Sequence, residues 1–209
     1  MKRGVVNRDG RAARWAEHRQ ARRAELVQAA LQAARQFGAA TGLAEIAAEA
    51  GVTKPVLYRH FDDKDDLLRA VLAAVAGEVF LPAMAAGLDP SQPDEQLVVG
   101  AIGTYVDLLV QERPLYDFAR ANSAVAGGDF VGSMEDALAQ ALVALGRFRE
   151  GGTALGGDGP VALTTAYAVV GMVQLAVHRW LLEQDLPAEE LVRTLGHLVW
   201  QGLEPRDVG

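Results

Sequence analysis

The chain has 209 residues, of which 50% are hydrophobic and 22% are charged, a composition that supports a buried core and excludes a wholly disordered protein. It contains no cysteine, so disulfides, cysteine nucleophiles and cysteine metal ligands are excluded, and a cytoplasmic location is expected. The formal net charge is −7, yet residues 1–69 carry 13 Lys or Arg against 9 Asp or Glu, a local basic balance of the kind that attracts phosphates.

The first two predicted elements are a basic arm and a helix. Residues 1–13, MKRGVVNRDGRAA, combine charges with two glycines and little periodicity, which predicts a flexible arm. A helix is predicted from about Arg14 to Phe37, where Gly38 ends it. Its apolar side chains recur at spacings of one helical stripe: Leu26, Ala30, Ala33 and Phe37.

Two short helices joined by a glycine turn follow. The first is predicted over residues 43–50, LAEIAAEA, and Gly51 ends it. Thr53 has the residue type of an N-cap, and Pro55 falls in a first turn, where its missing N–H costs nothing. The second short helix is therefore predicted from Lys54 to about residue 60. This arrangement is a helix-turn-helix, whose second helix lies in the major groove of DNA.

The predicted second helix has residue types that suit DNA. Leu57 and Phe61 are four residues apart, so they share the face that anchors the helix to its domain. Lys54 can donate to guanine or to a phosphate, and Pro55 and Val56 can touch a thymine methyl. Phosphate contacts set the register, and base contacts set the sequence. The predicted DNA-binding residues are Thr53, Lys54, Pro55, Val56, Tyr58, Arg59, His60 and Lys64.

The run IAAEAGVTKPVLYRHFDDKDDLL, residues 46–68, resembles the DNA-binding signature of the TetR family of bacterial transcriptional regulators. Residues 21–38 resemble the family's first helix, and the likeness covers about residues 21–72. It implies that Tyr58, His60 and Lys64 hold phosphates, whereas Lys54, Pro55, Val56 and Arg59 face the groove. It also implies homodimers on palindromic operators, most of which repress until a small molecule binds the C-terminal domain.

The sequence departs from the family at one point. A threonine and an arginine that usually touch the DNA backbone near the start of the helix at 43 are replaced by Gly42 and Ala44. The arm is one hypothetical replacement, because basic arms elsewhere reach an adjacent minor groove. The alternative is a solubilising tail. The basic residues in question are Lys2, Arg3, Arg8, Arg11 and Arg14.

The rest of the chain is also predicted to be helical. The helices are expected near residues 63–85, 93–112, 114–123, 129–149, 160–185 and 188–202. The predicted fold is therefore all-α, with about nine helices in total. A three-helix helix-turn-helix domain over residues 14–70 follows the arm, and a helical domain for ligand binding and dimerisation covers residues 71–209.

The last two helices are the candidate dimer interface, because two recognition helices must meet two half-sites one DNA turn apart. The alternative is that these helices only close the core of one monomer. The apolar stripes in question are Ala162, Ala166, Val169, Val170, Val173 and Val177, and Leu191, Leu195, Leu198, Val199 and Leu203.

A cavity for a lipophilic or aromatic effector is expected between the helices of the second domain. Its candidate lining residues, each of which can also be ordinary core, are Phe80, Met84, Tyr105, Phe118, Met134 and Met172.

Other classes of function find little support. No nucleophile–base pair, cofactor motif or His-Glu-x-x-His pattern is present, so we expect no enzyme, no cofactor and no metal. The apolar stretch 161–177 is marginal in length and too polar for a bilayer span, so no membrane partner is expected. The prediction is a dimeric repressor that a small molecule releases from its operator. The alternative is a DNA-binding regulator without a small-molecule effector.

Overall fold

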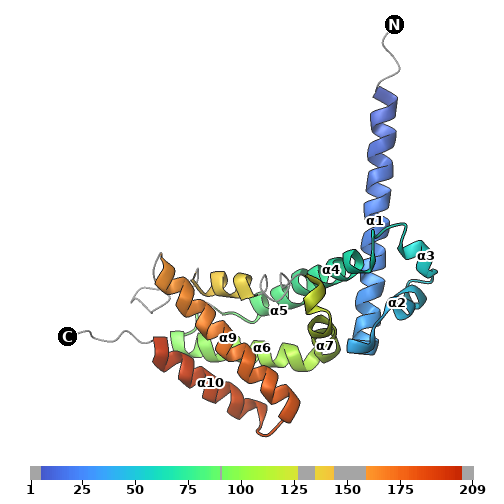
Figure 1. The fold of residues 1–209 in the computed structure, drawn as a ribbon. Helices are drawn as coiled ribbons and strands as arrows, with labels where there is room; N and C mark the ends of the chain where they lie inside the picture. Colours follow the sequence, from blue (N-terminus) through green and yellow to red (C-terminus); the bar gives the residue numbers. More distant parts are fainter. Residues whose placement is uncertain (1–5, 90, 127–134, 144–158, 204–209) are drawn as a thin grey trace. The chain divides into compact units, whose positions relative to one another are not determined.

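The computed structural model describes residues 6–89, 91–126, 135–143 and 159–203. These residues are largely helical and include no strand, which confirms the predicted all-α class (Figure 1). They divide into two compact units, each described by itself below. The first unit comprises Met1–Val75 and Glu112–Gly127, and the second comprises Ala76–Gln111 and Gly128–Gly209.

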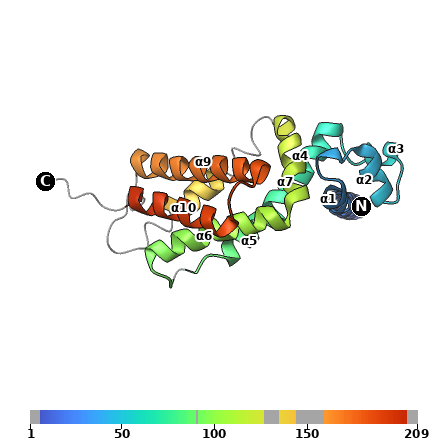
Figure 2. The same cartoon turned by 90° about the horizontal axis from the view of Figure 1, so that it is seen from below.

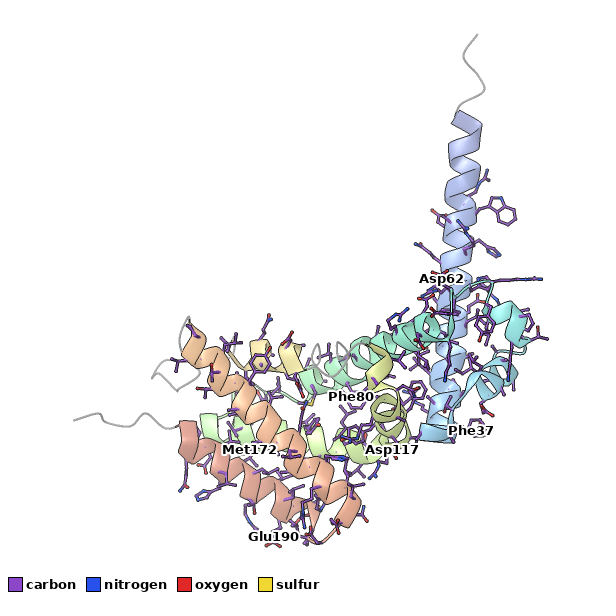
Figure 3. All side chains as sticks on the ribbon, in the orientation of Figure 1. Phe37, Asp62, Phe80, Asp117, Met172 and Glu190 are labelled. Atoms are coloured by element: carbon purple, nitrogen blue, oxygen red, sulfur yellow. The ribbon has the colours of Figure 1, made fainter. Side chains whose placement is uncertain are left out.

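The first unit is built on a long helix, α1 (Val6–Phe37). This helix begins eight residues before the predicted start, so the expected flexible arm is helical from Val6 onward. Residues 6–13 contain two Ala and two Arg, which favour helix, and they extend a helix already formed over residues 14–37, which offsets the cost of one glycine. Its inward face includes Leu26, Ala30 and Leu31, all buried, whereas Phe37 is 43% exposed although the stripe predicted it inside (Figure 3).

The helix-turn-helix follows as predicted. Helix α2 (Leu43–Glu49) ends in a turn where Gly51 has φ +62, a left-handed value that favours glycine. Helix α3 (Lys54–Leu57) starts with Pro55 in its first turn, and α4 (Lys64–Ala74) leads out of the motif. Helix α2 packs against α1, and α3 lies beside α2 (Figure 2). The core they enclose contains Ile46, Ala47, Leu57, Phe61, Leu67 and Leu68.

A later helix, α7 (Arg113–Ala121), also belongs to the first unit. Its Leu115 is fully buried, and Glu112 accepts two hydrogen bonds from the guanidinium of Arg35 at 3.1 and 3.2 Å. A short 3₁₀ turn, η3 (Ser123–Ala126), follows. The expected division at residue 70 left these residues in the other domain, because local sequence signals do not report which helices pack together.

The second unit is a helical bundle. It contains α5 (Leu81–Ala86), preceded by a π-helical turn over Val75–Phe80, then α6 (Asp94–Gln111) and a helix over residues 135–143. Helices α9 (Pro160–Glu183) and α10 (Ala188–Leu203) complete it and lie side by side (Figure 2). Gly196 is required where α10 meets α6, because a Cβ there would come within 2.6 Å of Val99.

The apolar stripe that we assigned to a dimer interface faces mainly inward. Ala162, Ala166, Val170, Val173 and Val177 are buried within the monomer, as are Leu191, Leu195 and Val199. These residues therefore close the core of one chain, which was the alternative reading. The periodicity alone could not tell a core face from a partner face, because both are apolar.

Two stretches, Lys64–Ala86 and Pro160–Glu183, are long and apolar enough to cross a membrane by length and composition. The core helix of a soluble protein passes the same test, so this observation is weak evidence for a membrane span. The inward stripe of α9 is buried against other helices of its unit. The expectation of no membrane partner stays a prediction.

Candidate functional site

The recognition segment, residues 53–61, is anchored by two side chains. Leu57 and Phe61 are 1% and 2% exposed, as their spacing predicted. Regular α-helix ends at Leu57, earlier than expected, and the backbone continues in tighter turns in which the His60 N–H donates to the Leu57 carbonyl at 2.9 Å. The anchoring leaves the other side of the segment to solvent.

The predicted DNA-binding residues lie on this segment and on the helix that follows it. Lys64 is separated from them in sequence but begins α4, directly after the loop that leaves the segment. Thr53 holds the N-cap position with extended backbone angles, although its hydroxyl makes no capping bond. Exposed side chains are those of Thr53, Lys54, Pro55, Tyr58, Arg59 and Lys64, and half-buried ones are those of Val56 and His60.

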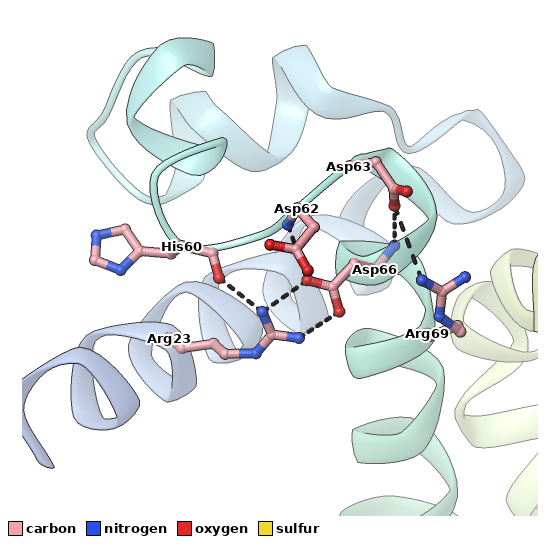
Figure 4. Close-up of polar contacts among 6 residues, drawn as sticks. All are labelled: Arg23, His60, Asp62, Asp63, Asp66 and Arg69. Atoms are coloured by element: carbon pink, nitrogen blue, oxygen red, sulfur yellow. Dashed lines mark hydrogen bonds and ion pairs between the residues drawn. The ribbon is translucent and has the colours of Figure 1, made fainter. Parts of the chain in front are cut away.

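A clamp from α1, which the sequence reading missed, holds the exit of the recognition segment. The guanidinium of Arg23 donates to the His60 carbonyl at 2.6 Å and to both carboxylate oxygens of Asp66, at 2.9 and 2.6 Å (Figure 4). The same guanidinium lies over the Phe61 ring, 4.2 Å from its centroid. Arg23 thus fixes the backbone of the segment and the first turn of α4 together.

Asp66 also makes hydrogen bonds within the loop that joins the recognition segment to α4. Its carboxylate also accepts from the Asp62 backbone N–H at 3.0 Å, while its own N–H donates to the Asp63 carboxylate at 2.6 Å, which caps α4 (Figure 4). The Arg23 guanidinium, followed by the Asp62 N–H, lowers the pKa of Asp66 to about 2. The bond to Asp66 in turn raises the pKa of Arg23. Both groups are therefore charged at neutral pH.

No local signal identified this clamp. Arg23 and Asp66 are 43 residues apart, and the acidic run over residues 62–66 has an ordinary explanation at a helix N-terminus. A pairing of this kind depends on how α1 packs across α4. Only the tertiary structure reports that packing.

The departure at the start of α2 has a clear structural consequence. Gly42 occupies the N-cap and offers no side chain, while its N–H donates to the Glu45 carboxylate at 2.9 Å. Thr41 is buried, and its hydroxyl donates to the Gly38 carbonyl at 2.7 Å. Ala44 is exposed but apolar. The side chains of Gly42 and Ala44 therefore offer no polar group at the start of α2.

The second unit contains a cavity of about 360 Å³. Among the residues that the structure describes, none of those lining it is charged, and Gln174 contributes the one amide. Helices α5, α6 and α9 supply most of its wall, together with the helix over residues 135–143. The lining residues are Leu81, Met84, Ala85, Leu88, Val98, Ala101, Ile102, Tyr105, Ala137, Leu138, Ala141, Leu142, Val169, Val170, Val173, Gln174 and Val199.

Two of the six predicted effector residues, Met84 and Tyr105, line this cavity. Phe118 does not, because it is fully buried in the core of the first unit. Phe80 is buried in the second unit but does not line the cavity, and Met172 is 38% exposed on α9 (Figure 3). Met134 lies outside the described residues. The sequence analysis predicted a wall of large Phe, Met and Tyr side chains. The observed wall consists mostly of Ala, Val and Leu, whose smaller volumes leave the space open.

Metal binding has no support in the described part of the chain, where His, Asp and Glu form no group of three or more that would hold an ion. The site that the geometry does define is the exposed basic recognition segment of a helix-turn-helix, held in place by α1 and α4. This arrangement, in an otherwise helical protein, defines the class of DNA-binding transcriptional regulators.

Comparisons with known proteins identify the family. Residues 26–71 match the family model described as bacterial regulatory proteins, tetR family. The chain is 36% identical over 201 residues to an HTH-type transcriptional regulator of Mycobacterium tuberculosis strain H37Rv, covering 95% of this chain and 84% of that protein. The chain therefore belongs to the TetR family of bacterial transcriptional regulators, a family of DNA-binding proteins and not of enzymes.

Two solved structures show a similar fold. One is the multidrug binding protein EbrR complexed with imidazole, with a TM-score of 0.64 at 23% identity, covering 90% of this chain and 92% of that one. The other is the transcriptional regulator FadR from Bacillus subtilis in complex with stearoyl-CoA, with a TM-score of 0.58 at 17% identity, covering 86% and 98%. Both likenesses concern the fold alone.

Proposed function

We propose that the protein is a dimeric repressor that leaves a palindromic operator when a small lipophilic or aromatic molecule binds its second unit. The observation that carries the ligand part is the apolar cavity of about 360 Å³. A ligand that prefers a form with wrongly spaced recognition helices weakens DNA binding by its difference in affinity for the two forms. The alternative, a regulator without an effector, would be favoured by a filled core in the second unit.

The proposed DNA contacts are those of the recognition segment. Lys54 and Arg59 are exposed cations next to Pro55 and Val56, a combination suited to base edges and thymine methyls in the major groove. The phenol of Tyr58 and the ammonium of Lys64 are exposed donors for phosphate oxygens. Acting on DNA in this way, the protein would work in the cytoplasm.

Dimerisation is proposed through the outer face of α9, with a contribution from α10. Val161, Leu175 and Leu182 are 76%, 71% and 64% exposed and lie on the side of α9 away from its buried stripe. Leu198 of α10 is 52% exposed. Exposed large apolar side chains of this kind are typical of an interface between subunits.

Selection of binding sites from a random duplex library tests the dimeric reading. Sequences bound by the purified protein are expected to contain an inverted repeat, with half-site centres one helical turn apart, roughly 34–36 Å. Light scattering of the free protein should give the mass of two chains. Enrichment of a single unrepeated half-site would contradict the proposed dimer, and no enrichment at all would contradict specific DNA binding.

The chemistry of the cavity predicts the class of ligand. Its uncharged wall favours a neutral apolar molecule, and Gln174 offers one hydrogen-bonding group to orient it. FadR, which has a similar fold and was solved with stearoyl-CoA, is an example of this fold holding a ligand with a long apolar chain. The cavity described here has no charged group to pair with an ionic ligand.

Filling the cavity should remove ligand binding while sparing the operator. In Ala101→Phe the ring would occupy the space between α6 and α9, so saturable binding of the neutral fluorescent probe N-phenyl-1-naphthylamine should weaken at least about 10-fold. Ala86→Phe is the control, because Ala86 is exposed on α5 and does not line the cavity. Equal probe affinity in the wild type and in both variants would show that the cavity is not the ligand site.

A further inference from the structure

The N-terminal part of α1 carries much of the positive charge of an acidic protein. Residues 1–23 contain eight of the chain's 20 Lys and Arg but two of its 27 Asp and Glu. Residues 6–22, called the N-terminal extension below, project past α2, α3 and α4 with no other described element of their unit beside them (Figure 1). The extension is about 25 Å long at the rise of an α-helix.

The clamp shows where the extension leaves the helix-turn-helix. Arg23 bonds to the carbonyl of His60, so this point of α1 is level with the end of the recognition segment that carries the proposed phosphate contacts. Arg19 precedes Arg23 by four residues and therefore lies on the same face, one turn further out. Arg19 is exposed, and Trp15, one turn beyond it, is 66% exposed. This face therefore continues outward from the region where a DNA strand is expected.

The helical form of the extension determines how it can meet DNA. An α-helix with its side chains is about 10–12 Å across, whereas the minor groove is about 6 Å wide. A helix over residues 6–22 is therefore too wide to enter an undistorted minor groove, whereas Lys2 and Arg3 of the expected arm lie outside the described residues. A rigid basic helix beside a half-site can instead lie along the sugar–phosphate backbone, where charge attraction needs no groove.

We propose that the N-terminal extension is a second DNA contact, with Arg19 bonded to a phosphate and Trp15 packed against the neighbouring sugar–phosphate edge. Arg14, His18 and Arg22 lie on the neighbouring stripe of the helix, where Arg22 is paired with Glu25 at 2.6 Å. The inference rests on the proposed operator binding and adds a contact outside the recognition segment. It supplies affinity without reading bases, and it compensates for the phosphate contacts that Gly42 and Ala44 do not make.

A matched pair of charge-neutralising substitutions to glutamine tests the contact. Arg19→Gln removes a positive charge and Glu17→Gln removes a negative one, and both residues are exposed on the same helix. With the selected operator as probe, Arg19→Gln should weaken binding about 10-fold and reduce the slope of log K against log salt by about 2, one phosphate for each subunit. Glu17→Gln should strengthen binding slightly, because it removes repulsion from the backbone.

Operator duplexes of two lengths test whether Arg19 contacts the DNA backbone that flanks the half-sites. The loss in Arg19→Gln should disappear on a duplex trimmed to the two half-sites if the extension contacts the flanking backbone. Equal affinities and salt slopes for the wild type, Arg19→Gln and Glu17→Gln on the long duplex would overturn the inference. The proposed function would stand in that case, provided that substitutions in the recognition segment still abolish binding to the same probe.

Trp15 offers an independent optical test. The chain has three tryptophans, of which Trp180 is buried and Trp200 is half-buried, so quenching by acrylamide reports mainly on Trp15. Operator DNA should lower the quenching of the wild type and leave that of Trp15→Phe nearly unchanged. Quenching that falls with protein concentration in the absence of DNA would identify a second copy of the chain as the occupant and overturn the inference.

Discussion

The double variant Lys54→Ala/Tyr58→Ala is expected to lose at least about 100-fold in operator affinity, because a base contact contributes ~1–3 kcal/mol and both subunits of the proposed dimer would lose one together with a phosphate contact. Both side chains are exposed, with Tyr58 at 48%, and neither supports the core that Leu57 and Phe61 form. The thermal unfolding midpoint and the mass in solution should therefore stay those of the wild type. Fluorescence anisotropy with the selected operator measures the loss.

A matched variant on the other helix of the motif controls for general effects. Glu49 is exposed on α2, so Glu49→Ala also shortens a solvent-facing side chain of the helix-turn-helix. Its removal should leave affinity unchanged or slightly higher, since a negative charge is lost. If the double variant holds the operator at moderate salt as the wild type does, residues 53–61 are not the recognition element.

Arg23→Met should lower both stability and operator affinity, although Arg23 lies in the clamp and outside the recognition segment. The substitution removes the hydrogen bonds to His60 and Asp66 and the contact with the Phe61 ring, while the methionine keeps much of the apolar stem. Hydrogen bonds to charged groups contribute ~1.5–3 kcal/mol. We expect a loss of ~2 kcal/mol in the free energy of unfolding, read from denaturation followed by circular dichroism.

A nearby arginine provides the control for the clamp. Arg69 is half exposed, and its distance of 3.9 Å from the Asp63 carboxylate is long for an ion pair. The substitution Arg69→Met should therefore change the free energy of unfolding by less than about 1 kcal/mol. Arg23→Met and Asp66→Asn should also fail to add in the double variant, because both disrupt one interaction. Additive losses, or equal losses in the two arginine variants, would show that the clamp does not hold the segment.

The stability that the Arg23–Asp66 pair contributes should fall as the pH is lowered. Asp66 has a folded pKa of about 2 against an ordinary value of 3.8, so its contribution to stability is complete above the ordinary value and is lost as the pH falls toward 2. The difference in unfolding free energy between the wild type and Arg23→Met should therefore be constant near neutrality and shrink between about pH 4 and pH 2. A difference that stays constant over this range would contradict the charge pairing.

The recognition segment was predictable because its signals act over a few residues. Gly51 adopts the left-handed turn, Pro55 occupies a first helical turn, and Leu57 and Phe61 bury the face that their spacing defines. Each of these outcomes follows from backbone sterics or helix periodicity, which depend on residues at most four positions away. The same rules placed the later helices and the all-α class.

The helices, the glycine turn and the family could be predicted from residue order alone, whereas the choice of which helices and faces meet depends on three-dimensional packing. The pairing of Arg23 with Asp66, the place of Phe118 in the first unit and the inward stripe of α9 all depend on packing between distant segments. An apolar stripe predicts that one face of a helix is buried, but it does not indicate which other helix covers that face. Helix propensity depends on neighbouring residues in the sequence, whereas the helix that packs against each apolar face depends on how the side chains of the whole unit fill its core.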